Sequence, residues 1–162
     1  MKIIEKINQA HAAGQITTSF EFFPAKTDAG VANLLVRAAD MYSDLNPTFI
    51  TLTWRSAFKD ERLWLKIGAA LQRQGIDVLL HLTCHLPKKD LRRVVANARE
   101  AGIQNILALR GDPPIGQEHW RPREGGLKNA VELVRLIRED HGDYFCIAVA
   151  GYPEVVSRPS LA

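Results

Sequence analysis

Short apolar runs alternate with longer amphipathic stretches along most of the chain. The runs are nearly continuous in segments such as ILAL and CIAVA, which is typical of parallel strands that helices cover. The strands predicted in this way are 17–23, 49–54, 78–83, 105–109 and 145–150. The predicted helices between them are 30–42, 60–74, 88–101 and 127–140, and a further surface helix is expected within residues 1–15.

The regular alternation of strand and helix predicts an α/β fold with a parallel sheet. Two architectures fit this pattern, an open doubly wound sheet of five strands or a part of a (β/α)8 TIM barrel, and the pattern alone does not separate them. A complete barrel typically needs about 250 residues. A chain of 162 residues, considered by its length alone, therefore favours the open sheet.

Composition and charge narrow the class of protein. A hydrophobic fraction of 46% and a charged fraction of 24% are those of a globular domain. The net charge of +3 is spread over the predicted helices without interleaved aromatic residues, so no nucleic-acid partner is expected. No apolar run reaches the roughly 18–20 residues of a membrane span. With no signal-peptide pattern and with Cys84 and Cys146 expected as free thiols, the predicted location is cytoplasmic.

Polar and aromatic residues collect at the carboxyl ends of all five predicted strands. These ends read SFEFFP, TLTWR, HLTCH, LRGDPP and AGYPE. In α/β folds, open or closed, binding and catalytic sites are built at this edge of the sheet. The chain has no G-x-G-x-x-G motif and no P-loop, so neither a Rossmann nor an NTPase site is indicated.

The end of the first strand offers a possible acid. Strand alternation places Phe20 and Phe22 on one face and Ser19, Glu21 and Phe23 on the other. A carboxyl group among aromatic rings would be desolvated, which suits it to carry and donate a proton. An ion pair between Glu21 and an arginine, with a structural role only, fits the strand equally well.

The third and fourth strand ends carry further polar groups. His81, Cys84 and His85 could be read as metal ligands, but alternation directs Cys84 away from both histidines, so no metal is expected. An imidazole hydrogen-bonded to a cofactor or to the neighbouring backbone is favoured instead. After the fourth strand, Arg110 and Asp112 flank a glycine that lets the backbone approach a ligand closely.

The segments SFEFFPAKT, FITLTW, HLTC, NILALRGDPP and AGYPE, in this order, resemble the methylenetetrahydrofolate reductases over about residues 16–155. The stretches at 124–126 and 143–144 resemble the eukaryotic branch more than the bacterial one. The resemblance implies a (β/α)8 TIM barrel of which this chain holds about the first five βα units, an incomplete barrel. Residues 1–155 would be the N-terminal part of the catalytic domain, and 156–162 a tail unlike the family.

The resemblance also implies a reaction. A flavoprotein of this kind uses FAD to reduce 5,10-methylenetetrahydrofolate to 5-methyltetrahydrofolate with NAD(P)H, in one-carbon metabolism and methionine biosynthesis. Glu21 matches the general acid that opens the five-membered ring of the folate, and Asp112 the carboxylate beside the flavin that also holds the pterin. The positions that match FAD contacts are Thr53, Trp54, Ser56, His81, Arg110, Gly111, Asp112, Ala130 and Tyr152.

Some positions depart from the family pattern. Ala25 replaces the second proline of FFPP, residues 55–58 replace a glycine-rich turn, and Val156 replaces a histidine. The later strands of the family, which contribute further FAD and folate contacts, do not follow. The alternative function is therefore a truncated, inactive half-barrel, or a binding module that pairs with another subunit or forms a homo-oligomer. For the same reason we expect the chain alone to lack stable activity, because a barrel closes its sheet edge to edge.

Overall fold

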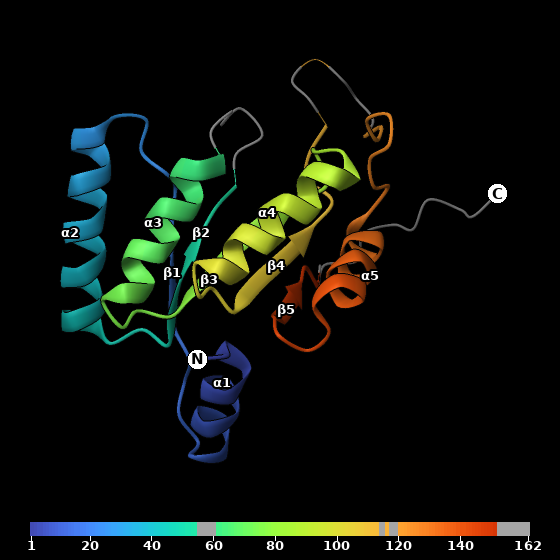
Figure 1. Ribbon diagram of the computed structural model, residues 1–162. Helices are drawn as coiled ribbons and strands as arrows, with labels where there is room; N and C mark the ends of the chain where they lie inside the picture. The colour runs from blue at the N-terminus through green and yellow to red at the C-terminus, as the bar shows by residue number, and fades with distance from the viewer. Residues whose placement is uncertain (55–60, 114–115, 117–119, 152–162) are drawn as a thin grey trace.

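The computed structural model describes residues 1–54, 61–113, 116 and 120–151. Its sheet consists of β1 (Ser19–Phe22), β2 (Phe49–Leu52), β3 (Val78–Thr83), β4 (Asn105–Leu109) and β5 (Cys146–Val149). Its helices are α1 (Ile3–Ala12), α2 (Asp28–Leu45), α3 (Glu61–Arg73), α4 (Lys88–Glu100) and α5 (Ala130–His141) (Figure 1).

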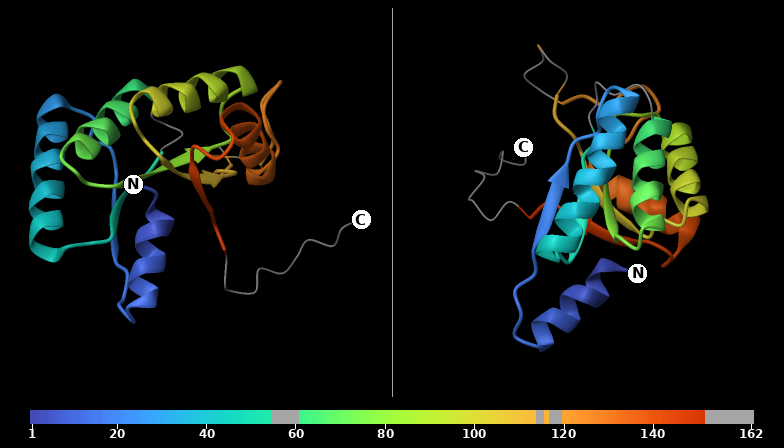
Figure 2. Two further views of the ribbon diagram at one scale, coloured as in Figure 1. Left: turned by 60° about the horizontal axis from the view of Figure 1, so that its bottom comes forward. Right: turned by 90° about the vertical axis from the view of Figure 1, so that its left-hand side faces the viewer.

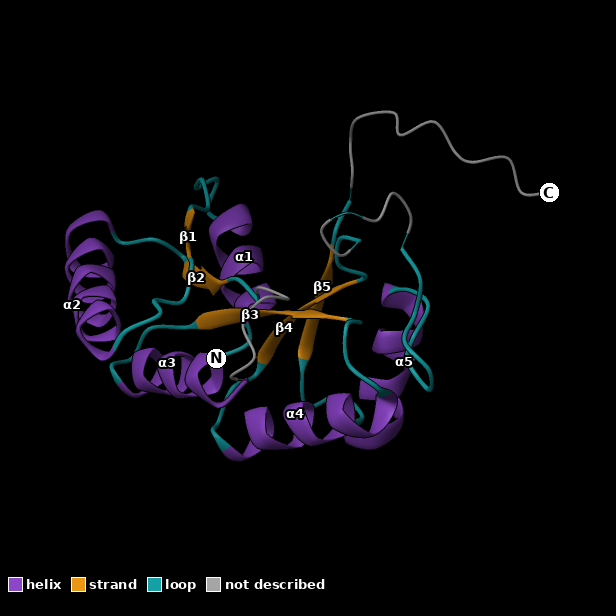
Figure 3. Ribbon diagram, turned by 90° about the horizontal axis from the view of Figure 1, so that it is seen from above, coloured by secondary structure: helices purple, strands orange, loops and turns teal. Residues whose placement is uncertain are grey.

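The five strands are parallel and lie side by side in the order β1-β2-β3-β4-β5. This order confirms the barrel-type arrangement and contradicts a doubly wound sheet, in which the strand order reverses. The strands follow a curved arc with α2, α3, α4 and α5 along its outer side (Figure 3). Within the described residues β1 and β5 are the two edges of the sheet, so the barrel is partial.

The predicted bounds of β3 and β4 are confirmed, whereas the other three strands are shorter than predicted by one or two residues at their ends. Capping side chains explain where two helices begin. Thr27 accepts a hydrogen bond from the backbone N–H of Gly30, so α2 begins at residue 28 and not at 30. Asn129 accepts one from the N–H of Glu132, so α5 begins at residue 130 and not at 127.

Strand alternation gives the sheet two chemically different faces. The face toward the outer helices is aliphatic and forms the hydrophobic core with them. The concave face carries Thr51, His81, Thr83 and Asn105, each at most 8% exposed. The strand residues of the core are Ile50, Leu52, Val78, Leu80, Leu82, Ile106 and Ala108. Polar residues are thus concentrated on the inner side of the arc.

Helix α1 lies below the amino ends of the strands, away from the outer layer of helices (Figures 1 and 2). The side chain of Asn105, which is 0% exposed, accepts a hydrogen bond from the N–H of Ile3 at 2.8 Å and donates one to the carbonyl of Met1 at 3.1 Å. Lys6 forms an ion pair with Asp77 at 2.7 Å. Burial alone would raise the pKa of Asp77, but its hydrogen bonds to Lys6 and to the amino terminus lower it below the usual value.

The contacts of Asn105 generate a prediction about stability. Asn105→Leu removes the hydrogen bonds to Met1 and to the first residue of α1, and it leaves the N–H of Ile3 without its partner. We expect a loss of about 2–4 kcal/mol in the free energy of unfolding, measured by urea denaturation. Asn8→Leu, the same change at an exposed position of α1, is the control and is expected to cost less than about 0.5 kcal/mol. Equal effects of the two changes would contradict this account of α1.

Candidate active site

Three elements bring Glu21, Thr53 and His81 together on the concave face. The hydroxyl of Thr53, just after β2, donates a hydrogen bond to Oε1 of Glu21 in β1. Nδ1 of His81 in β3 lies 3.7 Å from the same carboxylate oxygen. The N–H of Thr53 donates to the carbonyl of Phe22 at 3.0 Å, and this backbone bond fixes Thr53 beside the end of β1.

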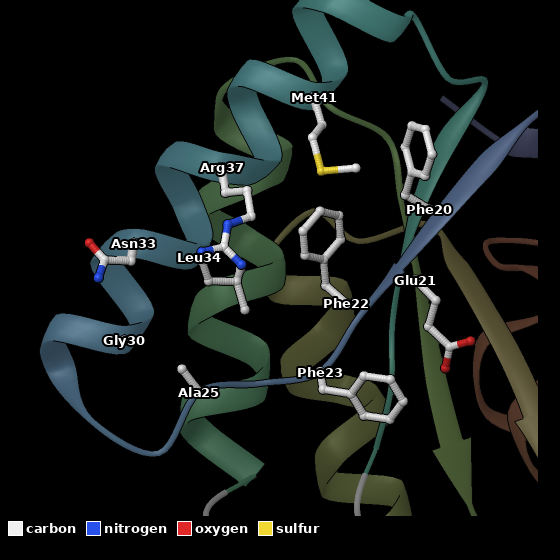
Figure 4. Close-up of a pocket in the computed structure, with 10 residues that line it drawn as sticks. All are labelled: Phe20, Glu21, Phe22, Phe23, Ala25, Gly30, Asn33, Leu34, Arg37 and Met41. Carbon is white, nitrogen blue, oxygen red and sulfur yellow. The ribbon is translucent and has the colours of Figure 1, made fainter.

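The expectation that aromatic rings desolvate Glu21 is wrong. Its side chain is 48% exposed. The ring of Phe22 points to the other side of β1 from the carboxylate (Figure 4). Phe23, which alternation puts on the side of Glu21, is itself 54% exposed and so does not cover it. The alternative, an ion pair with an arginine, is not seen among the described residues either. The polar neighbours of Glu21 there are Thr53 and His81.

His81 is a buried imidazole with a perturbed titration. Burial lowers its pKa, and the charge of Glu21, which acts in the opposite direction, is the smaller influence. The imidazole is therefore neutral at pH 7, and no cation faces Glu21 from this side chain.

The lowered pKa of His81 makes stability depend on pH with a definite sign. The unfolded chain binds the proton near pH 6.5, whereas the folded chain binds it only at lower pH. The contribution of neutral His81 to the stability of the fold is therefore fully present above pH 6.5. It is lost as the pH falls through 6.5 toward the pKa of His81 in the folded chain. We expect His81→Gln to flatten this part of the stability curve relative to the parent. An NMR titration in which His81 changes charge at or above pH 6.5 would contradict the assignment.

A second polar group lies where the chain leaves β4. The carbonyl of Arg110 accepts a hydrogen bond from the N–H of Cys84 at 3.1 Å. The carbonyl of Asp112 lies 2.9 Å from Nε2 of His85. The side chains of Arg110 and Asp112 are exposed, so they are presented at the carboxyl end of the strands. His85 confirms the expectation of an imidazole hydrogen-bonded to the neighbouring backbone.

Gly111 is required by its immediate surroundings. Its φ of +89° lies in the region that favours glycine, and a Cβ at this position would lie 2.3 Å from Cε1 of His85 and 3.1 Å from Cβ of Thr83. The structure shows that the missing side chain makes room for the imidazole of His85. The close approach of a ligand to Gly111 stays a prediction.

Substitutions at two glycines with similar backbone angles separate the cost of backbone strain from the cost of a collision with His85. Gly102 has φ +77° with nothing within 4 Å of a built Cβ, so Gly102→Ala tests backbone strain alone. We expect it to cost about 1–2 kcal/mol of folding free energy. Gly111→Ala adds the collision with His85, and we expect a total cost of at least about 3 kcal/mol, measured by denaturant titration. A cost of Gly111→Ala no greater than that of Gly102→Ala would show that His85 yields freely.

Cys84 belongs to the core and not to the polar site. Its side chain is 0% exposed, and its thiol lies 3.3 Å from the carbonyl oxygens of both Leu109 and Asn129. Burial raises the pKa of this thiol to about 11, so it is protonated and unreactive at neutral pH. His81 faces Glu21 instead, so these side chains diverge as alternation predicts.

Of the four remaining predicted site residues, two are described by the structure and two are not. The ring of Trp54 packs edge-on against Trp64 of α3, with ring centroids 4.8 Å apart, so this ring lies with the helix-side core. Ala130 is the first residue of α5 and follows Asn129, whose carbonyl contacts the thiol beside the end of β4. Ser56 and Tyr152 lie outside the described residues. The cofactor roles of all four stay predictions.

Sequence reasoning assigned no part to Thr83 or Trp120. Thr83 lies 2.9 Å from Nδ1 of His85, and the ring of Trp120 stands edge-on to the same imidazole at 4.7 Å between centroids. The signal for Thr83 was present in HLTCH, because His81, Thr83 and His85 share one side of an extended chain. The contact with Trp120 spans 35 positions along the chain and has no local signal.

A groove of about 560 Å³ lies between β1 and α2, on the opposite side of β1 from the carboxylate of Glu21. Phe22, Leu34, Arg37 and Met41 line it (Figure 4). Glu21 is among its lining residues, but the carboxylate points to the other side of β1 (Figure 4).

A parallel sheet in sequence order, with helices outside and polar residues at the carboxyl ends of its strands, is the architecture of (β/α)8-barrel enzymes. A comparison with protein families agrees with this class. The model of the methylenetetrahydrofolate reductase family matches residues 6–160, and the chain belongs to this family.

Individual relatives extend this result. The chain is 44% identical over 156 residues to methylenetetrahydrofolate reductase (NADH) 1 of Arabidopsis thaliana, covering 95% of this chain and 26% of the relative. It is 43% identical to methylenetetrahydrofolate reductase 2 of Saccharomyces cerevisiae, with the same two coverages. A 5,10-methylenetetrahydrofolate reductase of Pectobacterium carotovorum is 37% identical, covering 93% of this chain and 49% of the relative. The chain thus spans about a quarter of the eukaryotic relatives. In the described part of the chain, no helix is long and apolar enough to span a bilayer.

Proposed function

We propose that this chain forms the first five βα units of the catalytic barrel of an FAD-dependent enzyme. This enzyme reduces 5,10-methylenetetrahydrofolate to 5-methyltetrahydrofolate with NADH or NADPH, in the cytoplasm. The observation that supports it best is the cluster of Glu21, Thr53 and His81 at the carboxyl ends of adjacent strands, in a member of this family. The catalytic part of the chain would end near residue 155.

The concave face suits a flavin. The hydroxyl of Thr51 is buried without a hydrogen-bond partner among the described residues, and Thr51 pairs with Glu21 in the β1–β2 register. An isoalloxazine ring, which carries donors and acceptors along its edge, would be held by Thr53, His81 and the exposed Arg110. FAD supplies hydride transfer between the nicotinamide and the folate.

In this proposal Glu21 acts as the general acid. Thr53 donates a hydrogen bond to Oε1, which leaves Oε2 as the carboxyl oxygen that would pass a proton to the folate. The exposure of Glu21 leaves this oxygen accessible to a folate that lies over the strand ends. Neutral His81 places no cation beside the carboxyl group. Asp112, which is exposed after β4, the strand next to that of His81, would accept hydrogen bonds from the N–H groups of a pterin.

Binding of FAD to the purified protein tests the proposal directly. Bound flavin gives visible absorbance that is displaced from its free position, and titration gives the affinity. A chain that binds neither FAD nor 5-methyltetrahydrofolate, but forms a defined complex by size exclusion, would favour the binding module over the enzyme. The two open edges of the sheet are the feature that supports that second function.

The assignment of Glu21 is tested in a fusion protein in which a relative supplies the remaining strands and helices of the barrel. Glu21→Gln should slow folate reduction by about a hundred- to ten thousandfold, the usual contribution of a general acid. Oxidation of NAD(P)H with an artificial electron acceptor should be nearly unchanged, because hydride transfer to the flavin needs no acid acting on folate. Glu5→Gln on α1 is the matched control and should change neither rate. Equal losses in both half-reactions would show that Glu21 holds the flavin or the fold instead.

A further inference from the structure

His85 lies within hydrogen-bond distance of residues at the carboxyl ends of two neighbouring strands, β3 and β4. It lies in the loop after β3, with Nδ1 2.9 Å from the hydroxyl of Thr83 and Nε2 2.9 Å from the carbonyl of Asp112. A carbonyl oxygen only accepts hydrogen bonds, so Nε2 carries a proton. Nδ1 faces the hydroxyl of Thr83, which is 6% exposed and can either donate or accept. Both hydrogen bonds can therefore form at once when Nε2 carries the proton.

The imidazole is itself held in place on two further sides. The Cα of Gly111 packs against it so closely that no Cβ would fit. Trp120 stands edge-on to the ring at 4.7 Å, and its indole N–H donates to the carbonyl of Lys128 at 3.1 Å. A ring fixed in this way is a rigid donor, and the hydrogen bond it makes has a set direction.

The Arg110–Asp112 turn is consequently anchored at both ends from the loop after β3. The N–H of Cys84 holds the carbonyl of Arg110 at 3.1 Å, and His85 holds the carbonyl of Asp112. The side chains of Arg110 and Asp112 are exposed. The direction in which Asp112 presents its carboxylate is set by the backbone of this turn.

We propose that His85 is a positioning residue: its Nε2–H clamps the Arg110–Asp112 turn to the end of β3 and so aims the carboxylate of Asp112 at the ligand. The clamp is a property of the described fold, whereas the aiming of Asp112 at a folate rests on the proposed function. His85 itself touches neither reacting atoms nor cofactor in this account.

Two substitutions at position 85 separate its two hydrogen bonds. The side-chain amide N–H of glutamine occupies the place of Nε2, so His85→Gln keeps a donor for the carbonyl of Asp112. Asparagine is shorter, so His85→Asn keeps a partner for Thr83 but does not reach Asp112. His11→Asn, at an exposed position of α1, is the matched control for loss of an imidazole.

Amide hydrogen exchange in the chain as it stands measures the clamp. The N–H of Cys84 reports on the turn because it bonds to Arg110, and the N–H of Cys146, bonded to Gln104 at 2.7 Å, reports on the opposite end of the strands. We expect His85→Asn to speed exchange at Cys84 about five- to tenfold, with Cys146 unchanged. His85→Gln should stay within about twofold of the parent. Equal exchange in the two variants, or equal acceleration at both amides, would overturn the clamp.

The protonation state gives an independent readout. Nitrogen NMR of the parent protein at pH 8 should show a proton on Nε2 of His85. A ring protonated on Nδ1 alone would overturn the assignment.

The aiming role is measured by ligand affinity. In the parent background His85→Asn should weaken binding of 5-methyltetrahydrofolate about five- to tenfold, and His85→Gln should largely restore it. In the Asp112→Asn background His85→Asn should cause no further loss, because the carboxylate that it positions is gone. Additive losses would show that His85 does not act through Asp112. If the parent binds neither FAD nor the folate, the proposed function fails, and the exchange experiment still decides the clamp.

Discussion

Burial of one face of the sheet is the constraint on which the other features depend. The strands can pack beneath α2–α5 only if every second residue is aliphatic, as Ile50, Leu52 and Leu80 are. The residues between them then point to the concave side, whatever their chemistry. Glu21, Thr51 and His81 therefore share one face because of the same alternation that builds the core. Because the strands are parallel, the carboxyl ends of neighbouring strands lie at one edge of the sheet, and their polar residues lie there together.

The two ends of the strands have different tasks. At the amino ends the polar groups are paired within the protein: Asn105 holds the start of α1, and Asp77 is paired with Lys6. At the carboxyl ends the charged groups of Glu21, Arg110 and Asp112 are exposed. Since an unpaired charge is tolerated only where solvent or a ligand reaches it, stability is concentrated at one end and ligand chemistry at the other.

Local patterns predicted the elements well and the contacts between elements less well. Continuous apolar runs located β3 and β4 to the residue, because a strand buried on both faces admits few alternatives. Chain length alone had favoured the open sheet. The resemblance to a family favoured the barrel instead. The surroundings of Glu21 were mispredicted because Phe23, the aromatic neighbour on the same face, is itself 54% exposed, and exposure is not encoded in alternation. The clamp of His85 on Asp112 depends on the geometry of two loops, which no periodicity encodes.

The state of the sheet edges links the fold to the proposed ligand. Val149 of β5 is 58% exposed, and Phe22 of β1 borders an open groove, so the aliphatic layer is thinner at the edges than at β3. A flavin held over the concave face would contact residues from β2, β3 and the end of β4 at once. Any ligand that binds only the folded chain stabilises it in proportion to the logarithm of its concentration over its Kd. Flavin binding and the order of this sheet would therefore be thermodynamically coupled. The coupling should be greatest at the carboxyl ends, where the proposed FAD contacts lie.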